Sequence, residues 1–167
     1  MTRTLSTAHG LAMVRMGFGL YFLATAYDKT THGWLSNGQP LARFVKPQLG
    51  HAEPWYRSFI QGTVLPHAGL LAQLVTIGEW TAGLCLFLGL FTPLGALVAI
   101  WLNCNYMLLK GLPNAAGSID RVFVLSNLVF LVSAAGLAWG LDGVLWRRAP
   151  RIARPLEHTV PVRPALR

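Results

Sequence analysis

One acidic residue, Glu79, lies in the middle of a long apolar run and is the first candidate for chemistry. Between Ala68 and Leu90 the chain carries no other acidic or basic side chain. A carboxyl group inside a membrane costs about 3 kcal/mol, so it is expected to face a protein interior or a cavity. In that position a carboxyl group can take up and release protons. The alternative is a structural hydrogen bond between helices.

Further polar residues interrupt the other apolar runs. Asn103, Tyr106 and Lys110 are spaced i, i+3 and i+7, which places them on one face of a helix. This face either lines a binding site or makes hydrogen bonds between helices. Arg15 and Asp142 are expected at the opposite membrane surface, where they form a structural pair. Alternatively, Arg15 extends its charged group to the near interface.

Four apolar runs are long enough to position these residues as membrane-spanning helices. We expect the spans at about 11–27, 68–90, 94–109 and 122–141. The second run has 23 residues, which as a helix extends roughly 35 Å, enough to cross a hydrocarbon core. Charged residues make up 12% of the chain, against about 25% in soluble domains. The sequence predicts an all-α integral membrane four-helix bundle over 1–148 and a basic tail rich in proline and arginine over 149–167.

A long connection, residues 28–67, joins the first two spans and is amphipathic. Leu41, Phe44 and Val45 fall at helical spacing, and aromatic residues recur beyond them. We expect short helices at the membrane interface, with Trp34, Trp55 and Tyr56 at the level of the lipid headgroups. With four spans, this connection lies on the same membrane side as Lys29, Lys110 and Arg121, which together form a charged mouth above Glu79.

Several classes of function are disfavoured by the sequence. Both cysteines, Cys85 and Cys104, lie inside predicted spans, and the histidines of the long connection match no metal-ligand spacing. There is no haem, flavin or nucleotide-binding motif. The net charge of +8 is explained by membrane topology and contact with anionic lipid rather than by nucleic acid. We therefore expect membrane lipid as a partner, no nucleic acid and no metal site.

Three segments carry a resemblance to a known family. They are RMGFGLYFLATAYDK from Arg15, GEWTAGLCLFLGLFTPLGAL from Gly78, and AAGLAWGLDGVLWRR over 134–148. They resemble the DoxX/DoxD family of small four-helix membrane proteins. The long first connection is more similar to the DoxD branch, which includes the membrane subunit of thiosulfate:quinone oxidoreductase.

The resemblance implies a subunit of a membrane redox complex that passes electrons from thiosulfate to a quinone, together with a partner subunit. Glu79 would then be catalytic, Lys29, Lys110 and Arg121 would bind the sulfur anion, and Asn103 or Tyr106 would contact the quinone. The location implied is the bacterial plasma membrane. The arginines that follow the last span favour cytoplasmic termini.

Two other functions remain open at this point. The chain is alternatively a non-catalytic accessory subunit packed against a larger, energy-transducing membrane complex. A third interpretation is a small membrane protein that binds lipid or another substrate.

Overall fold

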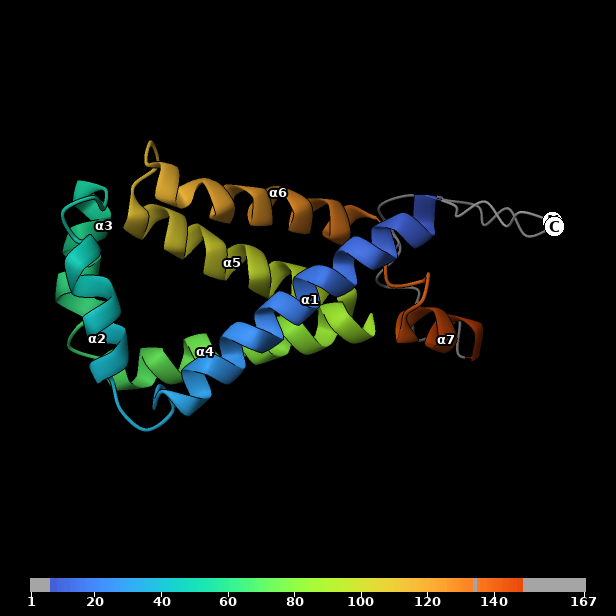
Figure 1. Ribbon diagram of the computed structural model, residues 1–167, viewed down its shortest axis with the longest axis horizontal. Helices are drawn as coiled ribbons and strands as arrows, with labels where there is room; N and C mark the ends of the chain where they lie inside the picture. Colours follow the sequence, from blue (N-terminus) through green and yellow to red (C-terminus); the bar gives the residue numbers. More distant parts are fainter. Residues whose placement is uncertain (1–6, 134, 149–167) are drawn as a thin grey trace.

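The computed structural model describes residues 7–133 and 135–148, in which every regular element is helical, as expected (Figure 1). The helices are α1 (Thr7–Thr31), α2 (Gln39–Val45), α3 (Pro54–Phe59), α4 (Ala68–Leu88), α5 (Thr92–Lys110), α6 (Ser118–Val132) and α7 (Leu141–Arg148). Short turns of other helix types occur at η1 (Lys46–Gln48), η2 (Ile60–Val64) and η3 (Ala115–Gly117).

The long helices pack in sequence to form the body of the molecule. α1 lies along α4, α4 packs against α5, and α5 packs against α6. α2 and α3 stand across the end where α4 begins and α5 ends (Figure 1). Close approach of α1 to α4 depends on Gly19, because a Cβ atom there would lie 2.3 Å from the backbone nitrogen of Phe87.

Two of the described helices are long and apolar enough to cross a membrane. They are α4, with 21 residues, and α5, with 19 residues, which correspond to the expected spans 68–90 and 94–109. α1 includes the expected span 11–27 and is 25 residues long. α6 has 15 residues, which extend only about 22 Å. The helical class is therefore confirmed, while the four-span bundle stays an expectation for α1 and α6.

The fourth expected span, 122–141, is not one continuous helix. α6 ends at Val132, Ser133 is extended, and α7 begins at Leu141. The guanidinium of Arg15 is fully buried and donates hydrogen bonds to the carbonyl oxygens of Ala135, at 3.0 Å, and Trp139, at 3.1 Å. These bonds satisfy carbonyl groups that the break releases from helical bonding. The hydrogen bonds of Arg15 therefore go to backbone.

Asp142 supplies the hydrogen-bond acceptors for the start of α5. Its carboxylate accepts bonds from the backbone nitrogens of Phe91, at 2.7 Å, and Thr92, at 3.0 Å. Phe91 has no side-chain acceptor of its own, and a carboxylate is favourable at a helix N-terminus. Arg15 and Asp142 thus lie at the same end, as the topology predicted, but the structure gives each of them backbone partners. The ion pairs found among the described residues join other side chains.

Replacing Asp142 by alanine is expected to lower the stability of the fold. The substitution removes both acceptors at the start of α5, and a lost helix cap typically costs about 1–2 kcal/mol. The midpoint of thermal unfolding in mild detergent measures the loss. Asp28→Ala is the matched control, because the Asp28 side chain is 70% exposed. Equal midpoints for the two variants would contradict a capping role.

Candidate functional site

The centre of the site is an ion pair between α1 and α4. The Nζ atom of Lys29 lies 2.7 Å from Oε1 and 2.8 Å from Oε2 of Glu79. The Glu79 side chain is 2% exposed and that of Lys29 is 15% exposed. Lys29 lies in the last turn of α1, and Glu79 lies midway along α4. The carboxyl group deep in the expected span therefore meets an ammonium that still reaches toward solvent.

Tyr106 joins α5 to this pair. Its hydroxyl donates a hydrogen bond of 2.9 Å to Oε1 of Glu79. The Nζ atoms of Lys29 and Lys110 lie 5.9 Å and 5.7 Å from the centre of the Tyr106 ring, within the range of cation–π attraction. The i, i+4 spacing of Tyr106 and Lys110 on α5 brings the second ammonium over the same ring.

Two tryptophans hold the end of α1 beside the pair. The Trp34 ring centre lies 5.2 Å from the Lys29 ammonium, and Trp34 is buried. The indole N–H of Trp80 donates to the hydroxyl of Thr30 at 3.0 Å. Trp80 directly follows Glu79 on α4, so this bond fixes the position of α1 relative to the carboxylate.

A second ion pair lies next to the first. Lys110 contacts Asp120 of α6 at 2.8 Å, and the Asp120 side chain is 6% exposed. Lys110 is the last residue of α5 and Asp120 lies in the first turn of α6. The charged groups at this end of the bundle thus come from four helices: α1, α4, α5 and α6.

Two predicted site residues have other partners. The amide of Asn103 is buried and donates to the carbonyl oxygen of Ala99 in its own helix, at 2.7 Å. The guanidinium of Arg121 binds the carbonyls of Leu112 and Asn114 and the hydroxyl of Ser118. The structure therefore brings together Lys29, Glu79, Tyr106 and Lys110, but not Asn103 or Arg121. No carboxylate is among these partners of Arg121.

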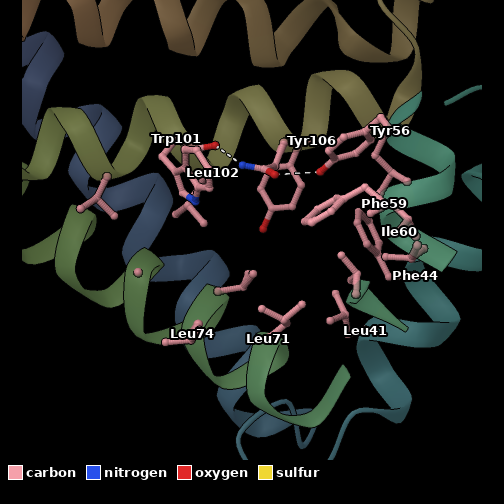
Figure 2. Close-up of a pocket in the computed structure, with 17 residues that line it drawn as sticks. Leu41, Phe44, Tyr56, Phe59, Ile60, Leu71, Leu74, Trp101, Leu102 and Tyr106 are labelled. Atoms are coloured by element: carbon pink, nitrogen blue, oxygen red, sulfur yellow. Dashed lines mark hydrogen bonds between the residues drawn. The ribbon is translucent and has the colours of Figure 1, made fainter. Parts of the chain in front are cut away.

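An apolar cavity of about 360 Å³ is linked to the ion pair through Tyr106, which lines the cavity and donates to Glu79. Figure 2 shows the Tyr106 hydroxyl pointing into the space between α5 and α4, where Leu71 and Leu74 form the opposite wall. The remaining lining residues come from α2, α3, η2, α4 and α5: Leu41, Phe44, Val45, Tyr56, Phe59, Ile60, Val64, Val75, Gly78, Val98, Trp101, Leu102, Asn105 and Leu109.

The polar edge of this cavity was not predicted as part of a site. Tyr56 is 5% exposed and donates to Oδ1 of Asn105 at 2.8 Å, whereas we expected it at the membrane surface. Trp34, which was also expected at the headgroups, is likewise buried. The third residue of that set, Trp55, is exposed, at 63%. The helical spacing of Leu41 and Phe44 was the available signal, since it predicted that one face of this segment would be buried.

The residues described here include no group of three or more His, Cys, Asp or Glu side chains that could hold a metal ion. The arrangement instead offers a connected series of groups that can exchange protons: the Lys29 ammonium, the Glu79 carboxylate and the Tyr106 phenol. This series ends at the wall of an apolar cavity. Such a pairing suits an apolar ligand that takes up or releases protons.

The ion pair is expected to dominate the stability of the bundle. Lys29→Met would leave the buried Glu79 carboxylate unpaired, which typically costs about 3–5 kcal/mol. The double variant Lys29→Met/Glu79→Leu removes both charges and is expected to be more stable than Lys29→Met. Unfolding midpoints in detergent give the comparison, with Lys46→Met, at an exposed position, as the control. Additive losses from Lys29→Met and Glu79→Leu would show that the two side chains are not coupled.

Comparison with known proteins identifies the family. A protein-family model described as DoxX matches residues 10–109, more than half of the chain. The match extends from α1 to α5 and includes Lys29, Glu79 and Tyr106. No curated protein and no solved structure matches the chain. Together with the two apolar helices, the family match identifies the chain as a membrane protein of the DoxX family.

Proposed function

We propose that this chain is the quinone-reducing membrane subunit of a redox complex that takes electrons from thiosulfate. The observation that carries the proposal is the hydrogen bond between Tyr106 and Glu79. It connects a buried ion pair to the wall of an apolar cavity. A quinone needs both an apolar slot for its ring and a source of protons for its oxygens.

The reaction balances as two half-reactions. Two thiosulfate ions each lose one electron and join through a new S–S bond to form tetrathionate. The quinone takes up these two electrons and two protons to become a quinol. The electrons pass either directly between the two reactants or through a carrier held by the partner subunit that the family resemblance implies.

The chain's own residues serve the proton half of this reaction. Tyr106 gives its phenolic proton to a reduced quinone oxygen and recovers a proton through Glu79. Lys29 connects Glu79 to the solution, because its side chain is partly exposed while Glu79 is buried. The hydrogen bonds that link Lys29 to Glu79 and Tyr106 to Glu79 are both shorter than 3.0 Å, within the reach that proton transfer requires.

Positive charge at the same end supports an anionic electron donor. Lys29 and Lys110 are close to the Tyr106 ring, but each is paired with a carboxylate. Arg121 binds carbonyl and hydroxyl groups there, so its charge is not neutralised by those contacts. We propose that Arg121 attracts the sulfur dianion to this end of the bundle and that Lys29 and Lys110 contact it there.

An accessory role is the second candidate, and the surface of α6 favours it. One side of α6 exposes large apolar residues: Ile119, Val122, Leu125, Leu128, Val129 and Val132. Such a surface packs against lipid or against another membrane subunit. In an accessory subunit, Glu79 and Lys29 would stabilise the fold without taking part in electron transfer.

Substitutions in the proton chain distinguish the two functions. Tyr106→Phe and Glu79→Gln are expected to lower thiosulfate-dependent reduction of decylubiquinone at least tenfold, because each breaks the route for protons. The assay uses the complex purified in mild detergent, and an absorption spectrum of that complex reveals any carrier. Tyr27→Phe and Glu53→Gln are matched controls outside the site. Unchanged turnover in both site variants, with normal amounts of complex, would support the accessory role.

A further inference from the structure

The carboxamide of Asn105 lies on the cavity wall with its orientation fixed. A backbone carbonyl can only accept, so the amide nitrogen must face the carbonyl oxygen of Trp101, at 2.7 Å. The amide oxygen then accepts the hydroxyl of Tyr56, at 2.8 Å. An asparagine amide has two N–H donors, and this contact takes one of them. The second N–H is therefore a donor available at the edge of the cavity.

Tyr56 keeps this geometry over a wide pH range. Burial raises the pKa of Tyr56 to about 12, so its hydroxyl stays protonated at neutral pH and continues to donate. The bond also ties α3, from the long connection, to α5 in the body of the bundle. Asn105 is thus held from both sides of its amide group, which gives its remaining donor a defined position.

The lining of the cavity favours a flat, conjugated ring. Five of its seventeen lining residues are aromatic: Phe44, Tyr56, Phe59, Trp101 and Tyr106. Aromatic rings pack favourably against other planar rings by offset or edge-to-face contact. A volume of about 360 Å³ lies at the lower end of the range for small-molecule sites. A hydrocarbon chain would fill the space but would use neither the Tyr106 hydroxyl nor the Asn105 amide.

The edge of the cavity opens toward the outer surface of the bundle. Three lining residues are strongly exposed there: Leu74 on α4 at 53%, Trp101 on α5 at 70%, and Phe59 on α3 at 43%. Among the described residues, α4 and α5 are the helices long and apolar enough to cross a membrane. A molecule dissolved in the bilayer would therefore reach the cavity from the side, between these helices.

From these observations we propose that Asn105 donates a hydrogen bond to one carbonyl of a bilayer quinone, while the Tyr106 hydroxyl donates to the other carbonyl oxygen. The quinone ring lies among the aromatic residues of the cavity, and its tail leaves past Leu74 and Trp101 into the membrane. This assignment rests on the proposed quinone-reducing function and adds the second contact and the route of entry. Asn105 is then a residue that positions the quinone. Tyr106 supplies the proton of one oxygen, and the oxygen at Asn105 takes its proton from the aqueous solution.

Direct binding tests the assignment separately from turnover. The probe is decylubiquinone, titrated into the purified full-length protein in lipid nanodiscs, with binding followed by equilibrium partitioning. Asn105→Leu removes the donor and is expected to weaken binding at least tenfold, since it leaves a quinone carbonyl without its partner. Asn105→Asp keeps an acceptor for Tyr56, loses both N–H donors, and is expected to show the same decrease.

Tyr56→Phe separates ligand contact from structure. It breaks the same Tyr56–Asn105 bond but keeps the amide donor, which Trp101 still holds on one side, so binding should weaken less than in Asn105→Leu. Tyr27→Phe, at an exposed position on α1, is expected to bind as the unaltered protein does. Equal losses in Tyr56→Phe and Asn105→Leu would overturn the assignment, because they would show that the pair only holds the fold.

Two further outcomes distinguish the assignment from the proposed function. If the complex reduces decylubiquinone and the Asn105 variants bind it normally, the quinone lies elsewhere and the assignment fails alone. If binding depends on Asn105 but thiosulfate gives no reduction, the quinone site stands and the proposed function fails. Displacement of decylubiquinone by stearic acid at equal concentration would show an acyl-chain site and overturn the choice of ligand.

Discussion

The ion pair between Lys29 and Glu79 is the constraint on which the arrangement of helices depends. A carboxylate midway along an apolar helix is tolerated only with a partner, because an unpaired charge in a medium of low dielectric constant is strongly unfavourable. Lys29 reaches Glu79 from the last turn of α1, and Tyr106 reaches it from α5. One acidic side chain therefore fixes the relative positions of three helices.

The opposite end of the bundle is held by charge in a different way. There, Arg15 and Asp142 bind backbone groups, at the break after α6 and at the start of α5. Such bonds replace hydrogen bonds that an uninterrupted helix would make for itself. An ion pair at one end thus joins side chains of neighbouring helices, whereas the charges at the other end compensate for irregular backbone.

Sequence patterns predicted the members of the charged cluster better than the helix boundaries. Glu79 was identifiable because an isolated charge in an apolar run is conspicuous, and helical spacing placed Tyr106 and Lys110 on one face. Asn103 shares that spacing, but its amide donates to a carbonyl of its own helix. The side-chain rotamer that the packing allows determines this partner. The carbonyl groups at the break after Val132 bond to Arg15, which lies more than a hundred residues earlier in the chain, so no local sequence pattern indicates this partner.

The cavity could not be predicted from any single segment, and that bears on how it would work. Its walls combine the long connection with α4 and α5, so its shape depends on how α2 and α3 rest against the bundle. Tyr106 belongs both to this wall and to the ion-pair cluster. A ligand that displaced the Tyr106 hydroxyl would therefore change the hydrogen bonding of Glu79 directly. Occupation of the cavity and the contacts of the Lys29–Glu79 ion pair are for this reason coupled through one side chain.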